Sequence, residues 1–236
     1  MIWRSVLLES RTIVMKEIKL SPSTFAFLWE ECPRCFWLEA TMGIKRPRGP
    51  FPSFFTRVDS TMKRRFADGG WHSVGDGLPQ FRVEHSEKMI WSSPIIVPDR
   101  NISLIIRGKF DSILLTEPAA LMMTDFKCAP VKLEHLDKYG RQLHAYTYAA
   151  EHPGAGSPVQ RMIDGLGLLV FEPSNFAYAG ETAQFGGALK WVPIERNDGG
   201  FMNFLDEVAA LLERPGPPAP SPHCEFCRFT GIDRAA

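Results

Sequence analysis

The 236-residue sequence lacks a net charge and lacks a long apolar run. It contains 27 Lys and Arg residues against 27 Asp and Glu residues, so no global field attracts it to nucleic acid, and a nucleic-acid partner would require local basic patches. Near the start, the apolar residues Val6–Leu8 are followed by Glu9 and Arg11, which interrupt them before a signal peptide or a membrane span can form. We therefore expect a cytoplasmic protein with no membrane contact.

Cysteine is scarce, and its placement is informative. Cytosolic proteins seldom keep structural disulfides, so paired C-x-x-C motifs indicate a metal centre. Thiolates at this spacing suit a tetrahedral Zn²⁺ ion and an iron–sulfur cluster equally well. The alternative is that the thiols are unrelated core or surface residues. The two pairs are Cys32 with Cys35 and Cys224 with Cys227, and Cys128 stands alone.

The composition predicts one main domain. With 44% hydrophobic residues, the chain is long enough to bury a core as a single unit. Residues 1–14 are expected to be a disordered or start-site extension, and residues 15–213 the domain itself. Residues 214–236 begin with a Pro-rich linker and end in a C-x-x-C tail, which we expect to pack back onto Cys32 and Cys35.

The stretch from residue 107 to residue 128 predicts a β-hairpin. Its arms are Ile102–Leu115 and Leu121–Cys128, separated by a Pro-containing turn. Side chains alternate along a strand, so Asp125 and Lys127 share one face and Phe126 points to the other. An acid and an ammonium group therefore lie together on an otherwise apolar strand.

Placing that pair on an apolar strand costs free energy unless the charges are compensated. One interpretation is a structural Asp125–Lys127 ion pair at a sheet edge. The other is a metal site, in which Asp111 and Asp125 supply oxygen ligands for Mg²⁺ or Mn²⁺ and Lys127 lies beside a metal-bound water. The D-x-K triplet alone does not decide between them.

The helix predicted over residues 133–150 carries Gln142 and Tyr146, which share a face because they are four residues apart. Taken alone, Tyr146 is a core aromatic and Gln142 a surface residue, but the pair also suits a functional role. The remaining predicted elements are a helix starting at Ser21, a helix over Val58–Phe66, strands over Gln80–Trp91, Ile163–Phe171 and Ala188–Ile194, and a helix over Asn203–Glu213.

Five short motifs follow one another along the chain: Leu20–Ser23, Cys32–Leu38, Gly108-Lys109-Phe110-Asp111, Asp125-Phe126-Lys127, and Gln142 with Tyr146. In this order they resemble the RecB-like branch of the PD-(D/E)xK nuclease superfamily, which includes the iron–sulfur exonucleases of CRISPR adaptation. The resemblance implies an α/β fold of the restriction-endonuclease type, with a mixed β-sheet flanked by helices. It also implies a four-cysteine metal centre that joins the N- and C-terminal regions.

The resemblance also implies a ligand set. Asp111 and Asp125 would hold one or two Mg²⁺ or Mn²⁺ ions, with the carbonyl of Phe126 as a further ligand. Asp59 would be a third side-chain ligand, in place of the His or Glu of the family's first motif. Glu84 and His85, on the following strand, are the alternatives for that role.

Three further residues take catalytic roles by resemblance. Lys127 would orient or stabilise the attacking hydroxide, and its position predicts a lowered pKa. Gln142 and Tyr146 would approach the metal site or the DNA.

The cysteines match the resembled nucleases only in part. In those nucleases one N-terminal and three C-terminal cysteines hold a [4Fe-4S] cluster, whereas this chain has two and two. Cys35 would have to replace one C-terminal ligand. Zn²⁺ therefore stays open as the alternative metal.

The predicted function is that of a metal-dependent DNA nuclease, exonuclease-like, acting on single strands or ends in repair, recombination, or phage or CRISPR-associated processing. The basic runs Lys45–Arg48 and Lys63–Arg65 are candidate DNA contacts or ordinary solvated charges. One alternative is a metal-stabilised nucleic-acid-binding or assembly module with a vestigial nuclease site. The other is a zinc-ribbon interaction protein in which the D-x-K pair is only an edge salt bridge.

Overall fold

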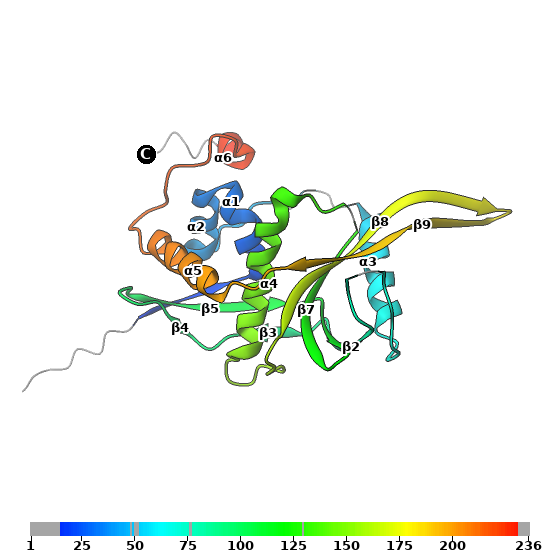
Figure 1. Cartoon of the computed structure of the whole chain (residues 1–236). Helices are drawn as coiled ribbons and strands as arrows, with labels where there is room; N and C mark the ends of the chain where they lie inside the picture. Colours follow the sequence, from blue (N-terminus) through cyan, green and yellow to red (C-terminus); the bar gives the residue numbers. More distant parts are fainter. Residues whose placement is uncertain (1–14, 48, 50–51, 76, 129, 231–236) are drawn as a thin grey trace, which may run out of the picture.

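The computed structural model describes residues 15–47, 49, 52–75, 77–128 and 130–230 (Figure 1). Residues 1–14, which the sequence assigns to an extension, lie outside this range. Within it, no helix is both long and apolar enough to cross a bilayer. The fold is a mixed α/β arrangement with two sheets and flanking helices, as the sequence predicts, although the sequence does not indicate that the strands divide into two sheets.

The first sheet is built around β5 (Ile102–Lys109). Strand β1 (Lys16–Leu20) pairs with it in parallel, and β3 (Met89–Trp91) and β4 (Ile95–Ile96) pair with it in antiparallel orientation. Because β1 comes from the start of the described chain, this sheet joins segments far apart in the sequence.

The second sheet has the order β2-β6-β7-β8-β9. Strands β7 and β8 are parallel, and the other neighbouring pairs are antiparallel. Parallel neighbours require a crossover connection, which here contains helix α4. The bounds are Phe81–Ser86 for β2, Ser112–Thr116 for β6, Ala120–Lys127 for β7, Gly165–Ala179 for β8 and Thr182–Ile194 for β9.

The helices cover the sheets and close the two ends of the chain. Helix α4 runs across the sheets, α3 lies near β2 and the base of the β8–β9 arm, and α6 lies above α1 and α2 (Figure 1). The bounds are Thr24–Leu28 for the π-helical η1, Trp29–Glu31 for α1, Pro33–Met42 for α2, Ser53–Phe66 for α3, Leu133–His135 for the 3-10 helix η2, Leu136–Glu151 for α4, Asp198–Leu212 for α5 and Glu225–Thr230 for α6.

Two predicted strands are each divided between the sheets. The predicted arm Ile102–Leu115 breaks at Phe110, so its halves are β5 and β6. The predicted strand Gln80–Trp91 breaks at Glu87, whose φ of 55° turns the chain from β2 into β3. Phe110 is fully buried, so the run of apolar residues continues through the break and hides it. Asp111 consequently lies where the chain passes from one sheet to the other.

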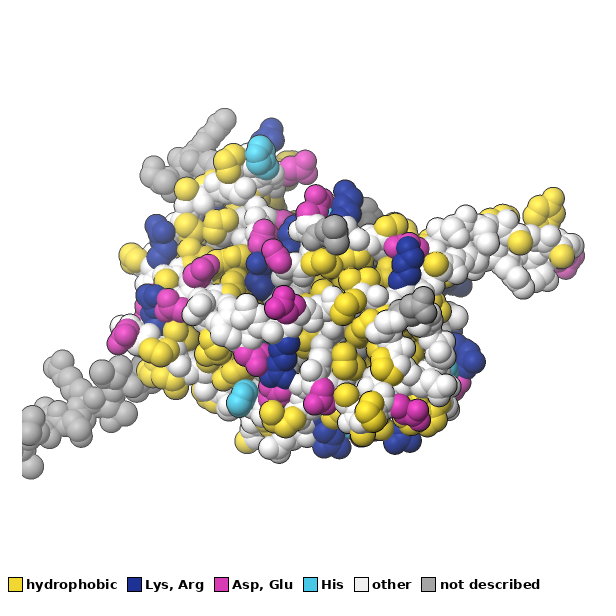
Figure 2. Space-filling view, viewed as in Figure 1, with side chains coloured by type: hydrophobic (Ala, Val, Ile, Leu, Met, Phe, Trp, Pro, Cys, Tyr) yellow, Lys and Arg dark blue, Asp and Glu magenta, His cyan; other side chains and the backbone are white. Residues whose placement is uncertain are grey.

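The predicted hairpin itself is confirmed in its second half, where β6 and β7 pair in antiparallel register. The strands β8 and β9 also pair, but they extend well beyond the predicted ranges and project from the molecule as a two-stranded arm (Figure 1). Figure 2 shows a largely uncharged surface on the arm, and residues 173–188 contain no Lys or Arg. The arm therefore supplies no electrostatic contact to a phosphate backbone.

Candidate active site and metal centre

The Asp111 carboxylate anchors the corner between the sheets to β7. Its Oδ2 accepts a hydrogen bond of 2.9 Å from the backbone N–H of Phe126. Its backbone carbonyl accepts hydrogen bonds from Glu87 N–H (2.9 Å) and Ser86 Oγ (3.2 Å). Asp111 thus connects the β2–β3 turn with the strand that carries the D-x-K triplet.

Asp125 and Lys127 lie on the same face of β7 and form an ion pair, as the alternation predicts. Asp125 is 5% exposed, and the Lys127 ammonium lies 4.7 Å from the centroid of the Tyr139 ring. Phe126 points the other way and stacks on Phe66 at 5.9 Å between centroids. Because β7 lies between β6 and β8, the pair is not at a sheet edge, which removes the edge-salt-bridge interpretation.

Lys63 is a site residue that the sequence reasoning missed. Its Nζ lies 2.7 Å from Asp111 Oδ1, 2.9 Å from Asp59 Oδ2 and 3.1 Å from Glu87 Oε1. The sequence signal was the four-residue spacing of Asp59 and Lys63 on one helix, but the basic run suggested a DNA contact instead. Glu87, which also pairs with Lys109, gave no sequence signal because it sits in a turn.

The charges in the site perturb one another. Burial, with the nearby charge of Asp125 as the second cause, raises the pKa of Asp111 to about 6. Burial also raises the pKa of Asp59. For Lys127, burial alone would lower the pKa, but the carboxylate of Asp125 outweighs it and the pKa is raised. The sequence predicts a lowered pKa for Lys127 beside a bound cation, whereas among the protein groups alone the carboxylate of Asp125 sets the direction.

Helix α4 contributes Gln142 and Tyr146. The Tyr146 hydroxyl donates a hydrogen bond of 2.8 Å to the carbonyl of Lys109, two residues before Asp111. Burial raises the pKa of Tyr146, which keeps this hydroxyl protonated. Gln142 is 7% exposed and not a surface residue, and its Oε1 has no hydrogen-bond partner in the described part of the chain. A buried acceptor without a donor commonly marks a functional position.

Three of the motifs meet at Gly108. A Cβ at this position would lie 2.7 Å from Pro22 Cδ and 3.0 Å from Tyr146 Cε1. The glycine is therefore required by close packing between β5, the segment before η1 and helix α4. Pro22, Gly108 and Tyr146 are remote in sequence, and their contact explains why the motifs occur together.

The alternative first-motif residues are not part of this site. Glu84 lies 3.8 Å from Arg161, and His85 Nδ1 lies 3.1 Å from Lys88 Nζ. Neither makes a described contact with Asp111. Of the three candidates, Asp59 is connected to Asp111, because Lys63 forms ion pairs with both carboxylates.

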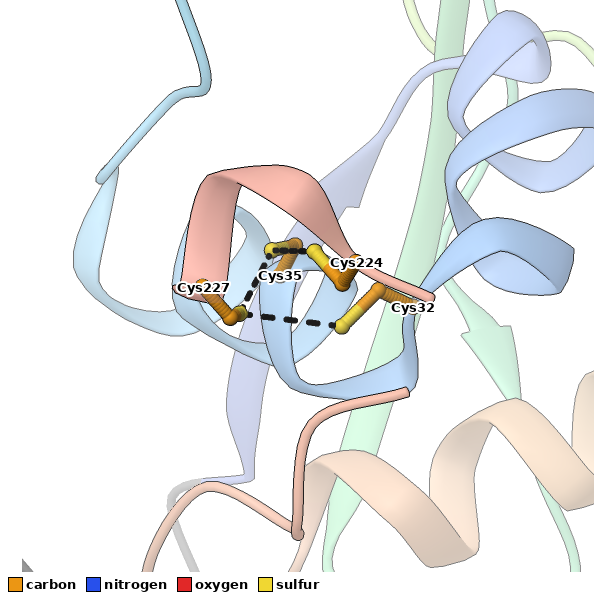
Figure 3. Close-up of side chains that lie close together, drawn as sticks. All are labelled: Cys32, Cys35, Cys224 and Cys227. Atoms are coloured by element: carbon orange, nitrogen blue, oxygen red, sulfur yellow. Dashed lines mark hydrogen bonds between the residues drawn. The ribbon is translucent and has the colours of Figure 1, made fainter. Parts of the chain in front are cut away.

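The four cysteines of the C-x-x-C pairs converge (Figure 3). All are buried, and their Sγ atoms lie within 4.8 Å of one another. The shortest separations are 3.5 Å for Cys35–Cys227, 3.7 Å for Cys35–Cys224 and 3.9 Å for Cys32–Cys227. Helix α2 begins between Cys32 and Cys35, and α6 spans Cys227, so the centre joins the N- and C-terminal regions as predicted.

Hydrogen-bond donors surround these sulfurs. Arg46 donates to Cys224 Sγ at 3.3 Å, and the Ser221 N–H donates to Cys32 Sγ at 3.4 Å. Burial would raise the pKa of Cys32, but hydrogen bonds from the backbone N–H groups of Ser221 and Cys35 and from the neighbouring thiols outweigh it and lower the pKa to about 7. Burial raises the pKa of Cys35 to about 11. Arg46 belongs to the basic run Lys45–Arg48, which the sequence offers as a DNA contact. In the structure its guanidinium group contacts the cysteine centre instead.

Both donor sets fit metals, in different ways. Four buried sulfurs with compensating donors suit a thiophilic metal ion. The carboxylates of Asp111 and Asp125 are hard ligands of the kind that Mg²⁺ and Mn²⁺ prefer. Among the described residues, the cysteines form the one group of three or more Cys, His, Asp or Glu residues whose ligand atoms all lie within 4.8 Å of one another. The three aspartates are more dispersed, because Lys63 lies between Asp59 and Asp111.

Comparison with known proteins identifies the family of the chain. The family model of the PD-(D/E)XK nuclease superfamily matches residues 53–232, more than half of the chain. The protein belongs to this superfamily, whose members are nucleases that use divalent metals. No curated protein matches the chain. Among solved structures, the crystal structure of SSO0001 is similar at a TM-score of 0.46 and 15% identity, over 91% of this chain and 84% of that one.

Substitution of Gly108 tests the contact between the motifs. Gly108→Ala forces Pro22 or Tyr146 to move, and overpacking of this kind costs about 1–3 kcal/mol of unfolding free energy. The measurement is Tm and denaturant midpoint. Gly140→Ala is the matched control: its Cβ meets Ile194 at an ordinary 3.6 Å, and alanine favours the helix. Equal stability of the two variants would contradict the packing argument.

Proposed function

We propose that this protein is a Mg²⁺- or Mn²⁺-dependent deoxyribonuclease that hydrolyses phosphodiester bonds. The observation that carries the proposal is the meeting of Asp111 with the Asp125–Lys127 pair at a central strand. Buried charges in the middle of a sheet are costly, and a structural role at an edge does not account for them.

Asp111, Asp125 and the carbonyl of Phe126 are the proposed metal ligands. The backbone N–H of Phe126 fixes the orientation of the Asp111 carboxylate relative to β7. A divalent ion at this position supplies a water of lowered pKa and neutralises charge on the phosphate. Membership of the superfamily supports this assignment.

Lys127 is proposed to hold the attacking water in line with the phosphorus. Its ammonium group is positioned by Asp125 and by the face of Tyr139. The ammonium group pairs with Asp125, and we propose that it acts by donating hydrogen bonds and stabilising negative charge. Gln142 and Tyr146 are proposed as positioning residues, because Tyr146 holds the backbone before Asp111.

The resemblance to RecB-like enzymes supports DNA as the substrate and an exonuclease-like action on single strands or ends. Repair, recombination, and phage or CRISPR-associated processing are the proposed settings. A cytoplasmic location is part of the proposal, supported by the paired C-x-x-C motifs, which in cytosolic proteins indicate metal centres.

The activity test is cleavage of end-labelled single- and double-stranded DNA with Mg²⁺ or Mn²⁺. Asp125→Asn and Lys127→Met are expected to lower the rate at least roughly 100-fold, because they remove a metal ligand and the charge beside the water. Lys190→Met, which breaks an exposed ion pair with Glu172, is the control and should leave the rate unchanged. The product ladder gives the polarity.

A vestigial site is the second candidate, and a specific observation favours it: the Lys63 ammonium already neutralises Asp111. If the parent protein binds DNA and cuts it with neither metal, the nucleic-acid-binding or assembly module becomes the better account. Loss of cleavage in both site variants, with retained folding, supports the nuclease.

For the cysteine centre, the sulfur separations favour a single Zn²⁺ ion. Tetrahedral coordination with Zn–S bonds near 2.3 Å places the sulfurs about 3.8 Å apart. The ligands of a [4Fe-4S] cluster lie roughly 6 Å apart, since each binds a different iron. The three shortest separations, of 3.5–3.9 Å, match the first geometry, and all four sulfurs lie within 4.8 Å of one another. We therefore propose zinc here, in preference to the [4Fe-4S] cluster that the resemblance implies.

The metal content tests this choice. Purified without oxygen, the protein is expected to carry one zinc per chain by mass spectrometry and no visible absorbance. Cys35→Ser should lose the zinc and lower Tm, since metal binding at such centres contributes folding free energy. Cys128→Ser removes a thiol outside the centre and should retain the zinc. Bound iron with visible absorbance would contradict the proposal.

A further inference from the structure

We propose that Lys63 is a tethered cation of the acidic site, which occupies the place of a second metal and limits the site to one divalent ion. The inference rests on the proposed function, because it concerns how that site binds its metal. It assigns to Lys63 a positioning role, not a DNA contact.

The contacts of Lys63 come from three separate elements. Asp59 lies one turn earlier on α3, Glu87 in the β2–β3 turn, and Asp111 at the corner between the sheets. An ammonium group has three N–H donors, and here each has a carboxylate oxygen within 3.1 Å. The hydrogen-bonding capacity of Lys63 is therefore filled by the site.

Lys63 is distinct from the basic residues beside it. Its side chain is 14% exposed, whereas Arg64 and Arg65 are exposed on α3. Arg65 pairs with Asp68 outside the site, and Arg64 donates to Thr61. Of the three basic residues Lys63–Arg65, only Lys63 directs its charge into the acidic site.

The position of Lys63 constrains Asp111. A two-metal site needs a carboxylate that bridges both ions. Asp111 Oδ1 is engaged by Lys63 and Oδ2 by the Phe126 N–H. Each carboxylate oxygen has two lone pairs, and these two contacts use one lone pair on each oxygen of Asp111. The lone pairs that would hold a second ion next to Asp59 face the ammonium group.

The net charge of the acidic site also favours one bound divalent ion over two. Four carboxylates, those of Asp59, Glu87, Asp111 and Asp125, face three ammonium groups, those of Lys63, Lys109 and Lys127. The cluster has one net negative charge. One divalent ion makes it singly positive, which suits one phosphodiester anion. Two ions would leave three positive charges within a few ångströms, and their mutual repulsion opposes the second.

Counting bound Mn²⁺ on the full-length protein tests the inference. At saturation, the parent is expected to bind one Mn²⁺ at the acidic site, with an electron paramagnetic resonance spectrum free of Mn–Mn coupling. Lys63→Met should raise the count to two and introduce the coupling. Lys63→Arg keeps a cation and should bind one ion, and the matched control Arg64→Met should also bind one.

The outcomes separate this inference from the proposed function. Two coupled ions in the parent, or one ion in a folded Lys63→Met variant, would overturn the tethered-cation role. If the Lys63→Met variant does not fold, Lys63→Gln, which also removes the cation, takes its place with the same expected count. Asp125→Asn should abolish Mn²⁺ binding. A parent that binds no Mn²⁺ above the level of Asp125→Asn would instead overturn the proposed metal site itself.

Discussion

The site depends on a single residue at the junction of two sheets. Asp111 uses its carboxylate to hold β7 through the Phe126 N–H, and its carbonyl to hold the β2–β3 turn through Ser86 and Glu87. These short contacts fix the backbone on either side of the corner. Together with helix α4, which packs on both β5 and β7, they position the strand that carries Asp125 relative to the first sheet, so the acidic site and the sheet junction share the same residue.

Burial of so many charges is tolerable because each has a partner. Asp125 is paired with Lys127, and Asp59, Glu87 and Asp111 share Lys63. An uncompensated charge at the centre of a sheet would cost several kcal/mol. Pairing reduces that cost but does not remove it: burial, with the nearby charge of Asp125 as the second cause, still raises the pKa of Asp111.

The sequence predicted what local periodicity and short motifs encode. Alternation placed Asp125 and Lys127 opposite Phe126, and helical spacing joined Gln142 to Tyr146 on α4. The break at Phe110 was invisible, since a buried residue continues the apolar run of both strands. Lys63 was misassigned because its role depends on carboxylates from two other elements. Such contacts form only when distant segments pack together, and the local sequence pattern does not predict them.

The cysteine centre and the acidic site are connected through packed aromatic rings. The centre fixes the start of α2, and η1 before it places Phe27 against Tyr139 of α4, with 6.1 Å between ring centroids. Tyr139 in turn faces the Lys127 ammonium at 4.7 Å. A metal bound by the four cysteines would therefore also restrain helix α4, whose Tyr139 ring faces Lys127. The C-terminal tail is too short to have a core of its own, so its attachment to Cys32 and Cys35 holds it to the domain. The same attachment links the tail to α4 through η1.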